Sequence, residues 1–267
     1  MGDALFSRDG DVFVPTDLTR GPWSPDAQHG GPPAALVVRA VSAVDAPAPM
    51  VVTRATFELL RPVPLAPLRV TTTVLRPGRK VQLVGASVVT VDGDVEVVRA
   101  TVLRVRSSSL PLPADVGVDE GRPDVPDEVA GDGFPMAVDT SLRHFHRDAM
   151  EIRPVAGGFD RPGPATAWFR LRVPVVEGEE PSGLERVAAT ADFGNGLSWV
   201  LPPGWQFINP DLTVHLLREP VGEWVCLASR TLPTDGGVGM AESALYDSAG
   251  RVGRSAQSLL LEDGGRA

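Results

Sequence analysis

The sequence predicts an α+β protein in which two copies of one unit each wrap an antiparallel sheet around a buried helix. Two observations predict this fold class. Each half contains one apolar helical segment followed by a run of strand-like segments. The halves also match residue by residue, since Phe57-Glu58-Leu59-Leu60-Arg61 and Val214-His215-Leu216-Leu217-Arg218 are separated by 157 positions (214 minus 57).

The helix of the first half is predicted for residues 30–44. It opens with two glycines and two prolines, and proline suits the first turn of a helix because its missing N–H has no partner there. After these residues only Arg39 and Ser42 interrupt the apolar run. A helix that is apolar nearly all round must be buried, and this one is too short to cross a bilayer.

Strands follow the helix in both halves, as segments rich in Val, Thr and Leu. The short Asp92-Gly93 connection favours a hairpin and therefore an antiparallel sheet. The second helix is predicted for residues 183–200. The predicted strands are 51–61, 68–76, 80–91 and 95–106 in the first half, and 206–217, 224–232, 237–247 and 251–261 in the second.

Residues 107–139 have the composition of a linker. They are rich in proline and hold seven acidic residues between Asp115 and Asp132, with Arg122 as the one basic residue. Such a segment buries too little apolar surface to offset its ordering entropy. The sequence therefore predicts an N-terminal domain at 1–106, a linker at 107–139 and a C-terminal domain at 140–267.

Composition excludes several classes of function. The net charge of −9 argues against nucleic-acid binding, which needs clustered basic residues. Cys226 is the sole cysteine, so no disulfide within the chain forms, and its place in an apolar strand predicts a buried thiol. The first ten residues do not resemble a signal peptide, and no apolar run is long enough for a membrane span. We expect a soluble cytoplasmic protein with no metal and no cofactor.

An antiparallel sheet around one buried helix is the hotdog arrangement, and two in tandem make a double hotdog. The chain resembles the thioesterase II family of acyl-CoA thioesterases, and within it an actinobacterial thioesterase-like branch. The segments that carry the resemblance are His29-Gly30-Gly31-Pro32-Pro33, Phe57-Glu58-Leu59-Leu60-Arg61-Pro62-Val63-Pro64, Ala191-Asp192-Phe193-Gly194-Asn195, Phe207-Ile208-Asn209-Pro210-Asp211-Leu212-Thr213 and Gly253-Arg254-Ser255-Ala256-Gln257.

The resemblance implies a catalytic Asp on the second helix, a Ser or Thr on the next strand and a Gln on the last strand. By motif these positions are Asp192, Asn209 and Gln257. Asn209 departs from the family's hydroxyl, but an amide also donates and accepts hydrogen bonds and can hold a water. Asp211 and Thr213, expected to share a strand face with Asn209, are the alternatives for that role.

Thioester hydrolysis needs a positioned water and a group that stabilises the oxyanion. Asp192 is expected on the shoulder of the second helix's apolar stripe, where partial desolvation suits a proton acceptor. The alternative interpretation makes Asp192 a cap for the turn at residues 194–196. For the oxyanion we expect the Gly30 and Gly31 amides at the start of the first helix, with His29 as an accessory donor. The alternative is that these glycines only make a tight turn.

The predicted function is hydrolysis of an acyl-CoA thioester to a free acid and CoA, within fatty acid metabolism. The ligand is expected between the halves, near both helix N-termini, and the prediction is compatible with a homo-oligomer. A non-catalytic acyl-CoA or acyl-carrier binding protein is the alternative that Asn209 keeps open. A hotdog enoyl-CoA hydratase is disfavoured, because such enzymes typically carry a His five residues after the helix Asp, and that position here is Leu197.

Overall fold

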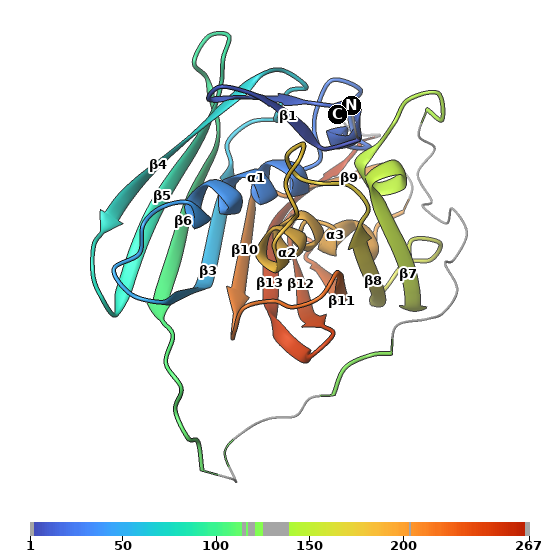
Figure 1. The fold of residues 1–267 in the computed structure, drawn as a ribbon. Coiled ribbons are helices and arrows are strands. Elements are labelled where there is room, and N and C mark those ends of the chain that lie inside the picture. The colour runs from blue at the N-terminus through green and yellow to red at the C-terminus, as the bar shows by residue number, and fades with distance from the viewer. Residues whose placement is uncertain (1–2, 114–115, 117–120, 125–138, 203, 265–267) are drawn as a thin grey trace.

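The computed structural model describes residues 3–113, 116, 121–124, 139–202 and 204–264. Within them, every strand pair is antiparallel, and helices α1 (Gly31–Ser42) and α2 (Gly183–Ala191) lie side by side on the sheet (Figure 1). In spatial order the sheet contains β1 (Phe6–Asp9), β2 (Val12–Pro15), β4 (Leu68–Arg76), β5 (Val81–Thr90), β6 (Glu96–Arg106), β3 (Met50–Leu59), β10 (Asp211–Leu216), β13 (Gly250–Asp263), β12 (Val238–Asp247), β11 (Trp224–Pro233), β8 (Ala165–Leu171) and β7 (Met150–Ala156), with β9 (Trp205–Ile208) paired to β13.

The sheet is continuous through both halves. The joint is the antiparallel pair β3 and β10, which are the matching strands of the two repeats. Thr56 lies opposite Thr213 in this pair, and the two positions are 157 residues apart, the separation of the sequence repeat. A pseudo-two-fold axis therefore passes between these threonines. The strands that follow on each side, β4 to β6 and β11 to β13, correspond at the same separation.

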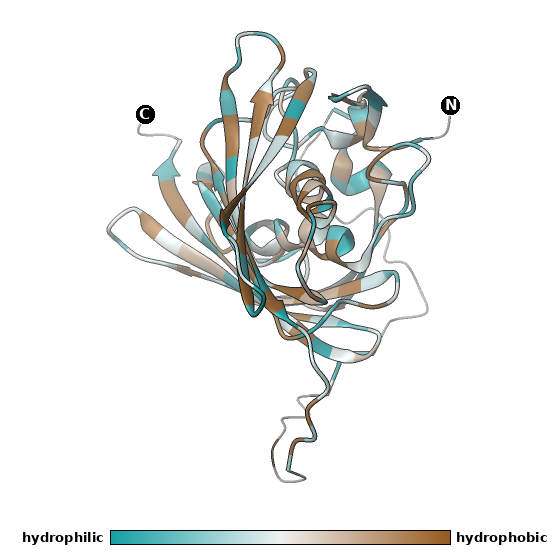
Figure 2. Cartoon of the chain, turned by 60° about the vertical axis from the view of Figure 1, so that its left-hand side comes forward, coloured by the Kyte–Doolittle hydropathy of each residue, from teal (hydrophilic) through white to brown (hydrophobic). Residues whose placement is uncertain are grey.

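The core lies between the helices and the face of the sheet that they cover. Strand β5 alternates buried and partly exposed residues along its whole length, as a strand with one covered face does. Helix α1 packs on β4, β5 and β6, and α2 packs on β8, β10 and β11. Figure 2 shows the matching alternation of hydrophilic and hydrophobic residues along the strands. The apolar helix predicted at 30–44 is thus a central helix, as expected.

The helix predicted at residues 183–200 is interrupted. Helix α2 begins at a capping box made by Ser182 and Glu185 and ends at Ala191, and a one-turn helix α3 (Gly194–Leu197) follows. At the break the Asn195 N–H donates to Oε1 of Gln257 at 3.2 Å instead of to a carbonyl of the preceding turn. A side chain inserted into the hydrogen-bond ladder explains the interruption.

The strand predicted at residues 206–217 is also divided. The chain bends at Asn209 and Pro210, between β9 and β10, because proline has no N–H to give to a ladder. Strand β9 pairs with the end of β13, while β10 pairs with β13 and β3. The bend takes Asn209 out of the alternation that governs β10.

The start of α1 lies against the end of α2 with no room for a side chain between them. A Cβ on Gly31 would lie 2.3 Å from the carbonyl oxygen of Ala189, and a Cβ on Gly30 would lie 2.7 Å from Oδ2 of Asp192. Both glycines have ordinary helical backbone geometry, so close approach is the reason for them. The group that approaches these glycines is the other helix.

Most of the predicted linker at 107–139 falls on residues 114–115, 117–120 and 125–138, which lie outside the described residues, and the division into domains stays a prediction. Across the described ranges, no helix combines the length and the apolar character needed to cross a bilayer.

We expect Gly31→Ala to lower the free energy of unfolding by about 1–3 kcal/mol, the usual cost of overpacking. The added methyl group forces α1 away from Ala189. Gly236→Ala is the control, because its Cβ would meet nothing closer than 3.7 Å, and it should stay within about 0.5 kcal/mol of the parent. Denaturant midpoints measure both. Equal midpoints for the two variants would contradict the contact.

Cys226 should be unreactive in the native protein. It is fully buried on β11, and burial raises the pKa of its thiol to about 12, whereas the thiolate is the reactive form. A thiol-reactive dye should therefore label one thiol per chain in denaturant and none on the same timescale under native conditions. Fast labelling of the native protein would show that this strand opens.

Candidate active site

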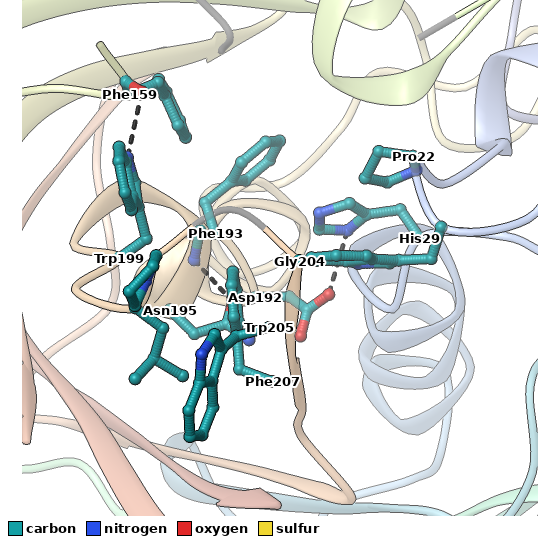
Figure 3. Close-up of a pocket in the computed structure, with 14 residues that line it drawn as sticks. Pro22, His29, Phe159, Asp192, Phe193, Asn195, Trp199, Gly204, Trp205 and Phe207 are labelled. Carbon is teal, nitrogen blue, oxygen red and sulfur yellow. Dashed lines mark hydrogen bonds and ion pairs between the residues drawn. The ribbon is translucent and has the colours of Figure 1, made fainter. Parts of the chain in front are cut away.

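The centre of the site is the carboxylate of Asp192, the residue that ends α2. Its side chain is 7% exposed. Oδ1 accepts hydrogen bonds from Nδ2 of Asn209 at 2.8 Å and from Nε2 of Gln257 at 3.0 Å. Oδ2 lies 3.0 Å from Nδ1 of His29, and Figure 3 shows the two side chains pointing toward each other. A carboxylate can accept about four such bonds, so one position remains for a further donor.

The amide of Gln257 is held in one orientation. Its Oε1 accepts the backbone N–H of Asn195, which requires the Nε2 group to face Asp192. The Asn195 side chain in turn lies 3.4 Å from Oδ1 of Asn209, whose Nδ2 donates to Asp192. Two amides thus present N–H groups to the same carboxylate oxygen. This is an arrangement that fixes a carboxylate in place.

The start of α1 completes the site. Pro32 and Pro33 carry no N–H, so Gly30 and Gly31 supply the amide groups at this helix end. The Gly31 N–H points at Nδ1 of His29, at 3.1 Å. The positive end of the helix dipole adds to the potential here, which favours a group that carries negative charge.

All six site residues predicted from the sequence meet in this one place: His29, Gly30, Gly31, Asp192, Asn209 and Gln257. The two alternatives do not. Thr213 bonds the hydroxyl of Thr56, and Asp211 accepts the backbone N–H of Ser258 at 2.6 Å. The expectation that they share a face with Asn209 is wrong, because the bend at Pro210 breaks the alternation.

Two further expectations are corrected. The site lies at the N-terminus of α1 but at the C-terminus of α2, not near both helix N-termini. The capping interpretation of Asp192 also fails, because the hydrogen bonds of its carboxylate go to side chains rather than to the backbone of the turn at residues 194–196.

An apolar pocket of about 260 Å³ opens beside Asp192. Both halves line it, and the rings of Trp23 and Phe207 meet edge to face with centroids 5.2 Å apart. No described residue of the lining is Lys or Arg. The lining comprises Pro22, Trp23, His29, Phe159, Asp192, Phe193, Asn195, Gly196, Trp199, Leu201, Pro202, Gly204, Trp205 and Phe207 (Figure 3).

The sequence left these aromatic residues unassigned. Three of the five tryptophans in the chain, Trp23, Trp199 and Trp205, line the pocket. Trp23 is far from the other two in sequence, so no local pattern joins all three. The one signal in the sequence that could have pointed to the pocket was that the chain has few tryptophans outside these three. Asn195, which connects Gln257 to Asn209, belongs to the segment Ala191-Asp192-Phe193-Gly194-Asn195, but the sequence alone indicates no role for it.

Apart from the Asp192 carboxylate, the closest side-chain neighbours of the His29 ring are aromatic. Its ring packs against Phe193 and Phe145, with centroids 4.6 and 5.2 Å away. Nearby His146 is buried, and this burial is the main reason that its pKa is lowered to about 3. His146 is therefore neutral at physiological pH. Among the residues described, no group of three His, Cys, Asp or Glu has a metal-binding arrangement.

Comparison with solved structures finds the same fold over nearly the whole chain. A provisionally assigned thioesterase II from Thermobifida fusca YX is 17% identical with a TM-score of 0.69, covering 96% of this chain and 95% of that one. A conserved hot dog fold protein from Alicyclobacillus acidocaldarius is 19% identical with a TM-score of 0.68, at coverages of 96% and 95%. Acyl-CoA thioesterase II TesB2 from Mycobacterium marinum is 15% identical with a TM-score of 0.64, at coverages of 92% and 96%.

At these identities the likeness concerns the fold, which is the hotdog fold predicted from the sequence. No curated protein sequence matches the chain significantly. Family models do: the acyl-CoA thioesterase N-terminal domain matches residues 19–105, and the acyl-CoA thioesterase C-terminal domain matches residues 120–261. Together they cover most of the sequence. The chain therefore belongs to the acyl-CoA thioesterase family of thioester hydrolases.

Proposed function

We propose that this protein hydrolyses an acyl-CoA thioester with a water held by Asp192, Gln257 and Asn209. The observation that carries the proposal is the buried Asp192 carboxylate, which three side chains hold at the mouth of an apolar pocket. Family membership supplies the reaction class. The geometry supports the assignment of the reacting groups.

In the first step the water oxygen attacks the thioester carbonyl carbon, and Asp192 accepts the water proton. The carbonyl oxygen becomes an oxyanion beside the start of α1, where the amides of Gly30 and Gly31 and the helix dipole oppose its charge. In the second step the C–S bond breaks, and the proton passes from Asp192 to the departing sulfur. The products are the free acid and CoA, and Asp192 returns to the carboxylate.

The pocket limits the substrate. A volume of about 260 Å³ is too small for a whole CoA molecule, so only the apolar part next to the thioester enters it. Because the described lining contains no cationic side chain, an acyl group that ends in a carboxylate would lose its hydration without a partner. The proposed substrates therefore carry neutral acyl groups.

A second candidate is a binding protein that holds an acyl thioester without cleaving it. The observation in its favour is Asn209, which stands where the family's hydroxyl is implied and whose amide already bonds Asp192. CoA release from a panel of acyl-CoAs, followed with a thiol-reactive dye, separates the two. Tight binding of every thioester tested, with no CoA released, would favour the binding protein.

Asp192→Asn should lower kcat by about 10²-fold or more, the usual scale for loss of a general base. KM should change little, because the pocket and the helix end remain. The control is Asp211→Asn, which removes the charge of an acidic residue that bonds the backbone of Ser258 away from the pocket. That variant should keep the parent rate. Normal turnover by Asp192→Asn would overturn the assignment of the base.

Gln257→Ala and Asn209→Ala should each reduce kcat by a smaller factor than Asp192→Asn, since each removes one of the two amides that bond Oδ1. Asn209→Thr restores the family's hydroxyl and should keep more activity than Asn209→Ala. Steady-state kinetics on one acyl-CoA give the ranking. If Asn209→Ala matches the parent, Asn209 only packs, and the water is held without it.

A further inference from the structure

The Nδ1 atom of His29 has two polar neighbours that make opposite demands on it. The Gly31 N–H, 3.1 Å away, needs a lone pair on Nδ1. The Oδ2 atom of Asp192, 3.0 Å away, needs a hydrogen on Nδ1 as long as Asp192 is a carboxylate. A ring nitrogen of neutral imidazole carries either a hydrogen or a lone pair. Both contacts therefore cannot be hydrogen bonds at the same time.

The bond to Asp192 is the stronger of the two. A hydrogen bond to an ionised carboxylate is about twice as strong as one between neutral groups. The alternative sets an imidazole lone pair against a carboxylate that is 7% exposed, where water screens little. Phe145 and Phe193 flank the ring, and nearby His146 is neutral. With Asp192 ionised, the hydrogen belongs on Nδ1.

This choice leaves the Gly31 N–H without an acceptor at the start of α1. Gly30, the residue before Gly31, offers no acceptor for this N–H. Pro32 and Pro33 have no N–H that could compete with it. The group that remains free is the amide that the proposed reaction needs for the thioester oxygen. When Asp192 gains a proton, Nδ1 no longer has to carry a hydrogen, and its one lone pair can then accept from the Gly31 N–H.

We propose that His29 is a positioning residue that couples the ionised state of Asp192 to the availability of the Gly31 amide. In the same state of the site, Asp192 is a carboxylate that can accept a proton and the Gly31 N–H is free to bind the oxyanion. This inference rests on the proposed hydrolysis, in which Asp192 accepts the water proton and the start of α1 stabilises the oxyanion. Its physical core, the placement of one hydrogen on Nδ1, can be measured without turnover.

Imidazole ¹⁵N NMR tests that placement in the full-length protein, whose four histidines make assignment practical. At neutral pH the free protein should show His29 with its hydrogen on Nδ1. Asp192→Ala removes the acceptor, so Nδ1 should then accept from Gly31 and the hydrogen should move to Nε2. A parent protein with its hydrogen on Nε2 would overturn the proposal, whether or not any acyl-CoA is hydrolysed.

Two variants of His29 test the coupling by kinetics. The side-chain nitrogen of Asn is as many bonds from Cα as Nδ1 and can only donate, so His29→Asn should keep kcat within about threefold. His29→Leu has a similar size and no donor, and should lose about 10- to 100-fold in kcat, the range for one hydrogen bond to a charged group. KM should stay within twofold in both.

The pattern distinguishes the competing roles. If His29 only fills space between Phe145 and Phe193, Leu should serve as well as Asn, which would overturn the proposal. If His29 itself takes the water proton, Asn should be as inactive as Leu, which would overturn it too. Melting temperatures identify a variant that has not folded, and in that case the NMR comparison of the parent protein still decides. A parent protein that hydrolyses no acyl-CoA would instead contradict the proposed function.

Discussion

The contact between the beginning of α1 and the end of α2 is the constraint on which the site depends. Two helices cross there at backbone distance, with Gly31 against the carbonyl of Ala189 and Gly30 against the carboxylate of Asp192. The contact brings together a helix end that favours negative charge and an acidic side chain from the other half. Neither half holds both parts. Any change that separates the helices separates the Asp192 carboxylate from the Gly30 and Gly31 amides, the groups proposed as base and oxyanion donors.

The sheet holds in place the polar side chains that surround this contact. Gln257 projects from β13 into the gap between α2 and α3, and its amide both interrupts the helix and orients the carboxylate. Asn209 reaches the same oxygen from the bend before β10. Every irregularity of the second half near the site, the helix break and the strand bend, thus delivers a polar group to Asp192. Irregular backbone at such places is common in functional sites.

Much of the fold could be predicted from the sequence because its signals are local. Alternation and turn residues predicted both ends of β4 (68–76) correctly. The apolar run predicted α1 to within two residues at each end. The interruptions could not be predicted in the same way, since the break after Asp192 depends on Gln257, a residue 65 positions away. Pro210 is a local signal for the strand bend, but the apolar character on both sides of it favours one continuous strand.

The candidate site, like the fold, could be predicted from the sequence only where its signals are local. Motifs named the polar residues, because each motif is contiguous in sequence. The aromatic walls of the pocket come from three separated segments, and only folding reveals that Trp23 and Phe207 touch. Gly31 and Asp192 both contact one atom, Nδ1 of His29, and this too is visible only in the three-dimensional structure. Sequence can name His29, but it cannot show that two groups compete for its Nδ1.

The pseudo-two-fold axis between Thr56 and Thr213 relates the backbones of the two halves. Exchange of the halves would carry Gln257 onto position 100 (257 minus 157) and Asn209 onto position 52 (209 minus 157). Those positions hold Ala100 and Val52, both buried in the core. The symmetry of the backbone is therefore not repeated in the chemistry. The second half supplies the side chains proposed to react and the first half supplies its helix end, so the proposed reaction has one centre in each chain.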